Sequence, residues 1–136
     1  MMTRDSDDTD DLPPGMEVDT SAAPALLRYT FRGDSPTPLA WIALRRRMVD
    51  SGYLTRDTSL LIDGRELTSL PTLAQLRAIM AAATNAPVVA RAIAFLTGDP
   101  TQFGVGRQAE MLLPNGVAGA VFTDESEAIA WCKAGR

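Results

Sequence analysis

The sequence predicts an α/β fold, in which a mixed, mostly parallel sheet of about five strands starts with a β-hairpin and packs against about four helices. Strand-like and helix-like patterns alternate after the first two strands, and consecutive parallel strands need the crossover connections that such helices provide. The chain has 136 residues, 46% hydrophobic and 22% charged, which suits one globular domain. The expected order of elements is β-β-α-β-α-β-α-β-α.

Two short alternating segments predict the opening hairpin. Residues 16–21 and 26–33 each have the pattern of a strand. In the second segment Leu27, Tyr29 and Phe31 alternate with polar side chains, and this period of two predicts one buried face and one wetter face.

The first helix and the next strand have clear boundaries. Residues 34–38 (DSPTP) break the second strand and provide a Ser or Thr cap and a Pro for the first turn of a helix. The apolar face of this helix starts at Leu39, and Gly52 ends it. Residues 59–63 are almost wholly apolar, as in a strand covered on both faces. Residues 64–66 are expected to leave that strand.

Three helices and two strands complete the order. They are a helix that Pro71 opens and residues 85–87 stop, the longest strand at 88–96, a helix at about 101–112, a strand at 116–122 and a helix capped by Thr123 or Asp124.

The formal charge of −4 lies in the first fifteen residues, which hold five Asp and one Arg. Such a polar segment cannot bury enough surface to fold, so we expect a disordered acidic tail at 1–15 and a single domain at 16–136. Nucleic-acid binding is not expected, because the only basic run, Arg45 to Arg47, fans out around a helix. The sequence has no apolar run of membrane-span length and no signal peptide, which favours a cytoplasmic location.

Missing residue types exclude several kinds of chemistry. The chain has no His, so it lacks the commonest acid–base catalyst and metal ligand. Its single Cys can form neither an internal disulfide nor a Cys/His zinc site. No cofactor is expected.

Three stretches carry a resemblance to a known family. They are the opening segment MEVDTSAAPALLRYTFRGDSPTPLAWIALRRRM, the central LLIDGRELTSLPTLAQLRAI, and the C-terminal FGVGRQAEML with GVAGAVFTDESEAIAWCKAG. Together they resemble the STAS fold of anti-sigma-factor antagonists, and more closely its SpoIIAA-like branch of mostly uncharacterised bacterial proteins. The resemblance covers residues 16–136.

The resemblance implies a phosphorylation site near the second helix. STAS antagonists carry an Asp-Ser pair there, and an anti-sigma kinase phosphorylates the Ser. Counted from Asp63, the pair falls on Pro71 and Thr72, so Pro71 replaces the acid. Thr72, Ser69 and Thr68 are the candidate acceptors, and the alternative is that these hydroxyls cap the helix.

The resemblance also implies an apolar pocket, because the SpoIIAA-like branch is grouped by fold with lipid-carrying CRAL-TRIO domains. The candidate lining residues are Trp41, Phe95, Phe103, Arg107, Phe122 and Trp131. The alternative is that the aromatic residues belong to the core, and that Arg107 pairs with Glu110 on the surface of a helix.

Two further patterns suggest chemistry. Gly104-Val105-Gly106-Arg107-Gln108-Ala109 matches a dinucleotide-binding fingerprint, with Asp124 twenty residues after Gly104, although the glycines do not directly follow a strand. Acids also follow the strands, and a cluster of them would suit Mg²⁺, although turns and helix caps select Asp as well. These acids are Asp34, Asp63, Asp99 and Asp124.

We therefore expect a non-enzymatic STAS/SpoIIAA-like binding or regulatory module. Its partner would be a protein, such as an anti-sigma-like kinase, or a small apolar or anionic ligand, and the exposed edge of the hairpin would allow a homodimer. The alternative is a small α/β enzyme or a nucleotide- or metal-binding protein that uses Asp63 and Asp99 or the turn at Gly104 and Gly106.

Overall fold

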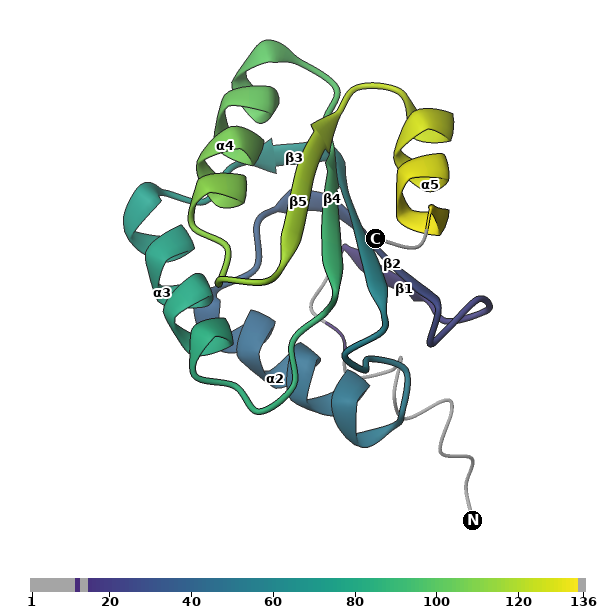
Figure 1. The fold of residues 1–136 in the computed structure, drawn as a ribbon. Coiled ribbons are helices and arrows are strands. Elements are labelled where there is room, and N and C mark those ends of the chain that lie inside the picture. Colours follow the sequence, from purple (N-terminus) through teal and green to yellow (C-terminus); the bar gives the residue numbers. More distant parts are fainter. Residues whose placement is uncertain (1–11, 13–14, 135–136) are drawn as a thin grey trace.

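The structure is a computed structural model that describes residue 12 and residues 15–134 (Figure 1). Within those ranges, five strands and four helices follow the predicted order. Their bounds are β1 Met16–Asp19, β2 Leu26–Asp34, α2 Pro38–Asp50, β3 Ser59–Ser69, α3 Leu73–Thr84, β4 Ala92–Leu96, α4 Pro100–Met111, β5 Ala118–Phe122 and α5 Glu125–Lys133. The predicted α/β class is confirmed.

The strands form one sheet in the order β1-β2-β3-β4-β5. β1 runs antiparallel to β2, with Met16 opposite Phe31, and every other neighbouring pair is parallel. The sequence left the strand order open. In the structure each helix from α2 to α4 connects two adjacent parallel strands, which is the simplest crossover that such strands allow.

Helices cover the two faces of the sheet unequally. Figure 1 shows α2, α3 and α4 on one face and α5 on the other. On β4, Ala94 and Leu96 pack with the α5 side, whereas Phe95 packs with α3 and α4, as the alternation of a strand requires. Cys132 is buried in α5 against the same β3 and β4 residues.

The first helix ends where the sequence predicts. Ser51 is the last residue with a helical backbone, and Gly52 follows with a φ of +83°, a left-handed conformation that glycine adopts without a steric penalty. The amide of Gly52 donates to the carbonyl of Val49 at 3.1 Å. At the other end of α2, the Thr37 side chain accepts from the Ala40 amide and Pro38 occupies the first turn.

Two strand predictions are wrong in length. The strand predicted to end at residue 63 continues to Ser69, because residues 66–69 pair with the far end of β2. The strand predicted at 88–96 contains only Ala92–Leu96, because β3 and β5 start opposite Ala92 and leave the preceding residues without a partner strand.

The predicted tail at 1–15 falls mostly outside the described residues. Leu12 packs against the core beneath the hairpin, and the carbonyl of Gly15 accepts from the Arg32 amide at 2.8 Å. Among the described residues, no helix combines the length and hydrophobicity that a membrane crossing requires.

Candidate functional site

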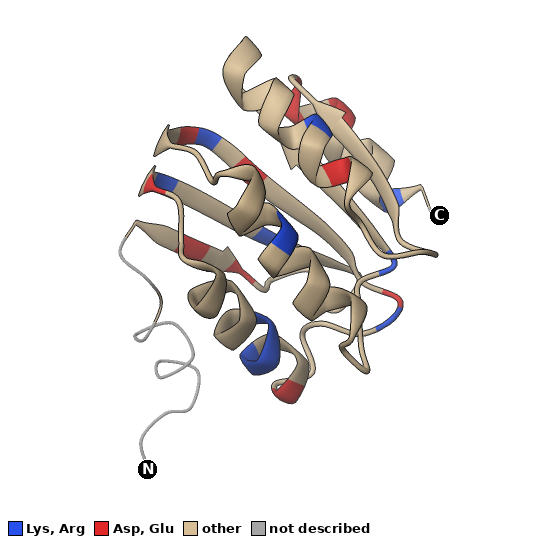
Figure 2. Ribbon diagram, turned by 90° about the vertical axis from the view of Figure 1, so that its left-hand side faces the viewer, with Lys and Arg blue, Asp and Glu red and all other residues tan. Residues whose placement is uncertain are grey.

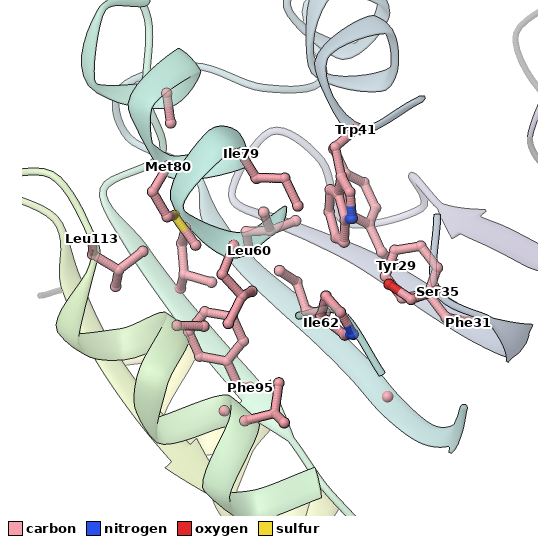
Figure 3. A pocket seen from close by; sticks show the side chains of 18 of the residues that line it. Tyr29, Phe31, Ser35, Trp41, Leu60, Ile62, Ile79, Met80, Phe95 and Leu113 are labelled. Carbon is pink, nitrogen blue, oxygen red and sulfur yellow. The ribbon is translucent and has the colours of Figure 1, made fainter. Parts of the chain in front are cut away.

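An apolar cavity of about 170 Å³ lies between the sheet and the three helices α2, α3 and α4 (Figure 3). Its floor is formed by side chains of β2, β3 and β4, including Tyr29, Leu60, Ile62 and Phe95. Nearly every lining group is a hydrocarbon or an aromatic ring. The site is therefore a space for an apolar group.

The helices form the rest of the wall with side chains at helical spacing. α2 provides Trp41 and Ile42, α3 provides Ile79 and Met80, and α4 provides Ala109. These small and medium-sized residues on α3 and α4 leave room that larger side chains would fill. The cavity is thus a consequence of side-chain size at the interface between the helices and the sheet.

Aromatic rings gather where α2 meets β2. The ring centroid of Trp41 lies 4.9 Å from that of Phe31 and 6.0 Å from that of Tyr29. Tyr29 and Phe31 meet edge to face at 6.3 Å. Such aromatic contacts stabilise the packing of α2 against β2 at this end of the cavity.

Tyr29 brings a polar atom to this wall. The residue is 2% exposed, and its hydroxyl makes no hydrogen bond with any described residue. Burial raises the pKa of Tyr29, while nearby Arg45 lowers it by a smaller amount. The hydroxyl therefore stays protonated and remains able to donate a hydrogen bond to a ligand.

Arg45 is the cationic group of the lining. It is half-buried between α2 and α3, and its Nη2 donates to the carbonyl of Ala82 at 3.4 Å. No carboxylate of the described residues pairs with it. Burial lowers the pKa of Arg45, but a guanidinium stays charged at neutral pH.

The structure does not bring the predicted pocket residues together. Trp41 and Phe95 line the cavity. Phe122 lies on the opposite face of the sheet, with its ring 5.7 Å from that of Trp131. Phe103 is partly buried on α4 and is not among the lining residues, and Arg107 is exposed.

The alternative interpretation of Arg107, an ion pair with Glu110 on the surface of a helix, is confirmed. Its Nε lies 3.2 Å from a carboxylate oxygen of Glu110, one turn along α4. The sequence reasoning missed Tyr29 and Arg45 as lining residues. The alternation of Leu27, Tyr29 and Phe31 could have placed Tyr29 on a helix-facing side, but no sequence signal separates Arg45 from its two Arg neighbours.

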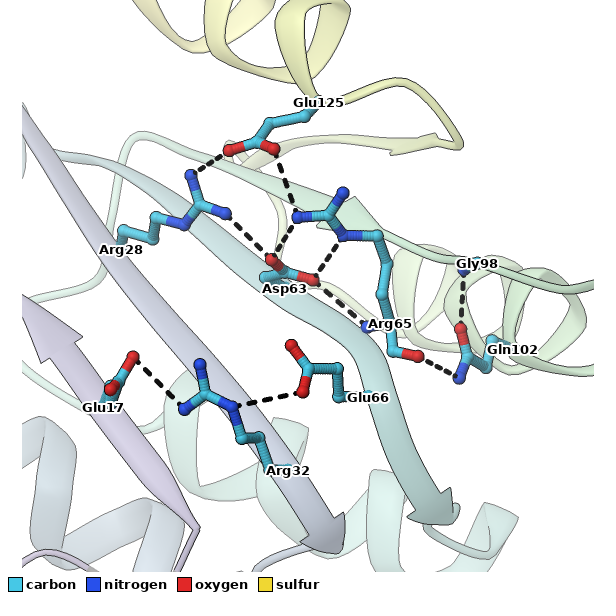
Figure 4. Close-up of polar contacts among 9 residues, drawn as sticks. All are labelled: Glu17, Arg28, Arg32, Asp63, Arg65, Glu66, Gly98, Gln102 and Glu125. Atoms are coloured by element: carbon cyan, nitrogen blue, oxygen red, sulfur yellow. Dashed lines mark hydrogen bonds and ion pairs between the residues drawn. The ribbon is translucent and has the colours of Figure 1, made fainter.

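A charged network occupies the other face of the sheet (Figure 4). Oδ2 of Asp63 accepts from Nη2 of Arg28 at 2.8 Å and from Nη2 of Arg65 at 2.8 Å. Glu125, at the start of α5, accepts from the same two arginines at 2.7 and 3.2 Å. Figure 4 shows the two acids and two arginines facing one another, so their charges balance.

Hydrogen bonds from the arginines lower the pKa values of both acids in this network. Burial by itself would raise the pKa of Asp63, but hydrogen bonds from Arg65 and Arg28 outweigh it and lower the pKa. A hydrogen bond from Arg28 also lowers the pKa of Glu125. Both acids are therefore ionised at neutral pH and act as acceptors.

A second set of paired charged side chains lies beside this network. Arg32 lies 3.2 Å from Glu17 on β1 and 3.2 Å from Glu66 on β3, and all three side chains are exposed. Apart from Glu125, the residues of both groups line a broad polar hollow of about 790 Å³ over β1, β2 and β3. Figure 2 shows the basic and acidic positions side by side on neighbouring strands. Although this hollow is larger than the apolar cavity, its charged groups already pair with one another.

The architecture is similar to that of a solved structure. That structure is the crystal structure of an uncharacterised protein of the DUF3478 family from Shewanella loihica PV-4, described as having a SpoIIAA-like fold, with a TM-score of 0.60 over 86% of this chain and 91% of that chain. The chain has a SpoIIAA-like fold. The two sequences are 18% identical, so the likeness concerns the fold alone. No family model matches the sequence, and no curated protein matches it.

Within this SpoIIAA-like fold, the candidate phosphorylation sites lie at the exposed end of β3 and the start of α3. Thr72 is the N-cap of α3: its hydroxyl accepts from the Gln75 amide at 3.1 Å, and the Gln75 side chain accepts from the Thr72 amide at 2.9 Å. The Ser69 hydroxyl accepts from the Ser35 amide at 3.3 Å, and Thr68 is exposed. The capping role of Thr72 is confirmed, and phosphorylation stays a prediction.

The dinucleotide fingerprint is contradicted. Gly104 and Gly106 lie inside α4 rather than in a turn that leads into a helix. A Cβ on Gly106 would lie 3.1 Å from Cγ1 of Val121, so this glycine lets α4 approach the sheet closely. Gly104 is exposed, and a Cβ there would meet nothing within 4 Å.

The acids that follow the strands do not form a cluster. Asp99 caps α4 by accepting from the Gln102 amide at 2.7 Å, and Asp124 caps α5 by accepting from the Glu127 amide at 3.1 Å. Asp63 is paired with arginines, and Asp34 is exposed at the end of β2. Within residue 12 and residues 15–134, no three metal-ligating side chains come together. The structure therefore gives no support to a metal site at Asp63 and Asp99.

Proposed function

We propose that this protein is a non-enzymatic binding module whose ligand occupies the apolar cavity beneath α2, α3 and α4. The observation that carries the proposal is the size and lining of that cavity, about 170 Å³ of space surrounded by apolar side chains. An engineered protein cavity of about 150 Å³ with a similar lining stays dry and binds benzene. A ligand group of about one aromatic ring therefore suits this space.

The free energy of apolar burial supports the same proposal. A ligand that enters this space removes apolar surface from water, which is favourable by about 25 cal/mol per Å². Domains of this size are stable by only about 5–15 kcal/mol. An apolar ligand that fills the space would therefore add measurably to the stability of the fold.

The charged face favours a structural role instead of a catalytic one. Asp63 and Glu125 are already bonded to Arg28 and Arg65, and their pKa values are lowered, so neither acid is suited to exchange protons at neutral pH. This argument supports a binding module over an enzyme.

Ligand-induced stabilisation tests the proposal. Benzene, toluene, ethylbenzene and indole are added to the full chain, and thermal unfolding is measured. A bound ligand at a hundred times its dissociation constant should add about 2.7 kcal/mol of stability. We expect stabilisation by at least one of these compounds, and the absence of an effect from the whole series would contradict the proposal.

Two variants of α3 locate the binding. Ala83 lines the cavity, so Ala83→Leu should fill the space and abolish the stabilisation. Ala81 lies on the exposed side of the same helix, so Ala81→Leu adds the same side chain to the surface and should leave the stabilisation intact. Equal ligand binding by both variants would place the ligand elsewhere.

A further inference from the structure

The cavity has one polar end, and this end restricts the ligand beyond its apolar part. The polar lining residues Ser35, Thr97 and Gln102 already make hydrogen bonds within the protein. Tyr29 from β2 and Arg45 from α2, in contrast, keep hydrogen-bond donors available to a ligand. The rest of the lining is mostly apolar. A ligand that fills the cavity therefore has its polar group fixed at this end.

The hydroxyl of Tyr29 makes no hydrogen bond with any described residue. The residue is 2% exposed as a whole, but its oxygen is not completely buried, so a ligand in the cavity can reach it. Because burial raises its pKa, this hydroxyl offers a proton to an acceptor and does not itself carry a negative charge.

Arg45 adds a positive charge that no carboxylate of the described residues pairs with. Its one described hydrogen bond goes to a backbone carbonyl at 3.4 Å, although a guanidinium has five N–H donors. Because Arg45 is half-buried, folding has already removed part of its hydration shell, so a carboxylate would meet a partly desolvated cation.

The charges on the surrounding helices also favour an anionic ligand. α2 and α3 together carry four Arg, at positions 45, 46, 47 and 77, and one acid, Asp50. The local field at this side of the molecule therefore favours an anion over a cation.

We infer that the ligand of the cavity is a small aromatic carboxylate, with its ring in the apolar space and its carboxylate bound by Arg45 and the Tyr29 hydroxyl. This inference rests on the proposed function and names the ligand class for the same site. A neutral ligand would leave Arg45 without a counterion, and a cation would be repelled.

Paired probes test the inference without any change to the protein. 3-Phenylpropionate and 3-phenylpropanamide have nearly the same shape, but only the first is an anion at neutral pH. Affinities for the full chain are measured by calorimetry or by NMR titration. We expect the carboxylate to bind at least about tenfold more tightly, because charge-assisted hydrogen bonds are the stronger ones. Equal affinities would overturn the inference while leaving the proposed cavity binding intact.

Two Arg→Gln variants, which each remove one positive charge from α2, test whether Arg45 is the group that binds the carboxylate. Arg45→Gln should reduce the preference for the carboxylate to less than about twofold, because it removes the guanidinium at the cavity. Arg46→Gln removes the same charge from an exposed position on the same helix, so it controls for the long-range field and should keep the preference. A preference that survives Arg45→Gln would overturn the assignment of Arg45.

The Tyr29→Phe variant measures the contribution of the hydroxyl to ligand binding. It keeps the ring and its contacts with Trp41 and Phe31, and it should weaken 3-phenylpropionate severalfold while leaving ethylbenzene unchanged. If 3-phenylpropionate and ethylbenzene both fail to bind the wild-type chain, the proposed function fails together with this inference. If ethylbenzene binds and 3-phenylpropionate does not, only the inference fails.

Discussion

Asp63 on β3 accepts a hydrogen bond of 2.8 Å from Arg28 on the neighbouring strand β2. The side chain of Asp63 is 5% exposed, while that of Arg28 is 22% exposed. The acid is therefore the buried centre of the charged network, and the arginines screen it from solvent. This relationship makes the stability of the sheet depend on pH.

The first prediction concerns acid unfolding. The pKa of Asp63 is lowered in the folded state, so its contribution to stability is present above the ordinary Asp pKa of about 3.9 and disappears as the pH falls through the folded value. We expect Asp63→Asn to cost about 2 kcal/mol at pH 7 and to flatten the loss of stability between pH 5 and pH 2. Urea unfolding across this pH range provides the measurement.

Glu125→Gln is the matched control for Asp63→Asn. Glu125 binds the same two arginines, but its side chain is 41% exposed, so the change should cost less than about 1 kcal/mol at pH 7. A larger loss for Glu125→Gln than for Asp63→Asn would show that the burial of Asp63 does not determine the strength of the network.

The second prediction separates the two glycines of α4. Gly104→Ala should stabilise the fold by about 1 kcal/mol, because a Cβ there meets nothing and alanine favours the helix. Gly106→Val should destabilise it by about 1–3 kcal/mol, because its side chain would be forced against Val121 and Thr97. Chemical denaturation measures both variants, and equal effects at the two positions would contradict the close approach of α4 to the sheet.

Local patterns in the sequence were sufficient to predict the order of the elements. The alternation of Leu27, Tyr29 and Phe31 and the caps at Thr37 and Asp124 act over only a few residues, so they can be recognised without knowledge of tertiary contacts. The strand lengths depend on pairing between segments that are distant in the sequence. Glu66 belongs to β3 because it pairs with Arg32, thirty-four residues earlier, and no local pattern reports that contact.

The candidate site was less accessible to sequence reasoning. Trp41 and Phe95 were predicted pocket residues and do line the cavity, but Phe122 has the same aromatic character and lies on the opposite face. The face of a short Gly/Ala-rich strand such as β5 is not fixed by hydrophobicity, because nearly all its residues are apolar. Which aromatic residues share a cavity therefore depends on strand register, and the structure provides that information.

The third prediction concerns the start of α3. Thr72→Ala removes the hydroxyl that accepts from the Gln75 amide and should cost about 1 kcal/mol, whereas Thr72→Ser keeps the acceptor and should cost much less. Thermal unfolding of the two variants provides the comparison. Equal losses for Ala and Ser would show that the lost methyl group of Thr72, and not its cap, accounts for the effect.

The fourth prediction concerns Gln102, a buried polar side chain that joins three segments. Its Oε1 accepts from the Gly98 amide at 2.6 Å, and its Nε2 donates to the carbonyls of Arg65 and Leu67 at 3.1 and 3.4 Å. This side chain ties the start of α4 to the extended part of β3 (Figure 4). Gln102→Leu keeps a similar volume but leaves these backbone groups unpaired, and we expect a loss of about 1–3 kcal/mol.

Hydrogen exchange gives this last prediction a local readout. In Gln102→Leu, the amide of Gly98 loses its acceptor, so it should exchange faster relative to the amides of β4, which keep their ladder bonds to β3 and β5. Gln108→Leu is the matched control, because Gln108 is exposed on the same helix and should change neither stability nor exchange at Gly98. Unchanged protection of Gly98 in Gln102→Leu would mean that another group satisfies this amide. In that case the far end of β3 would be held by its pairing with β2 alone.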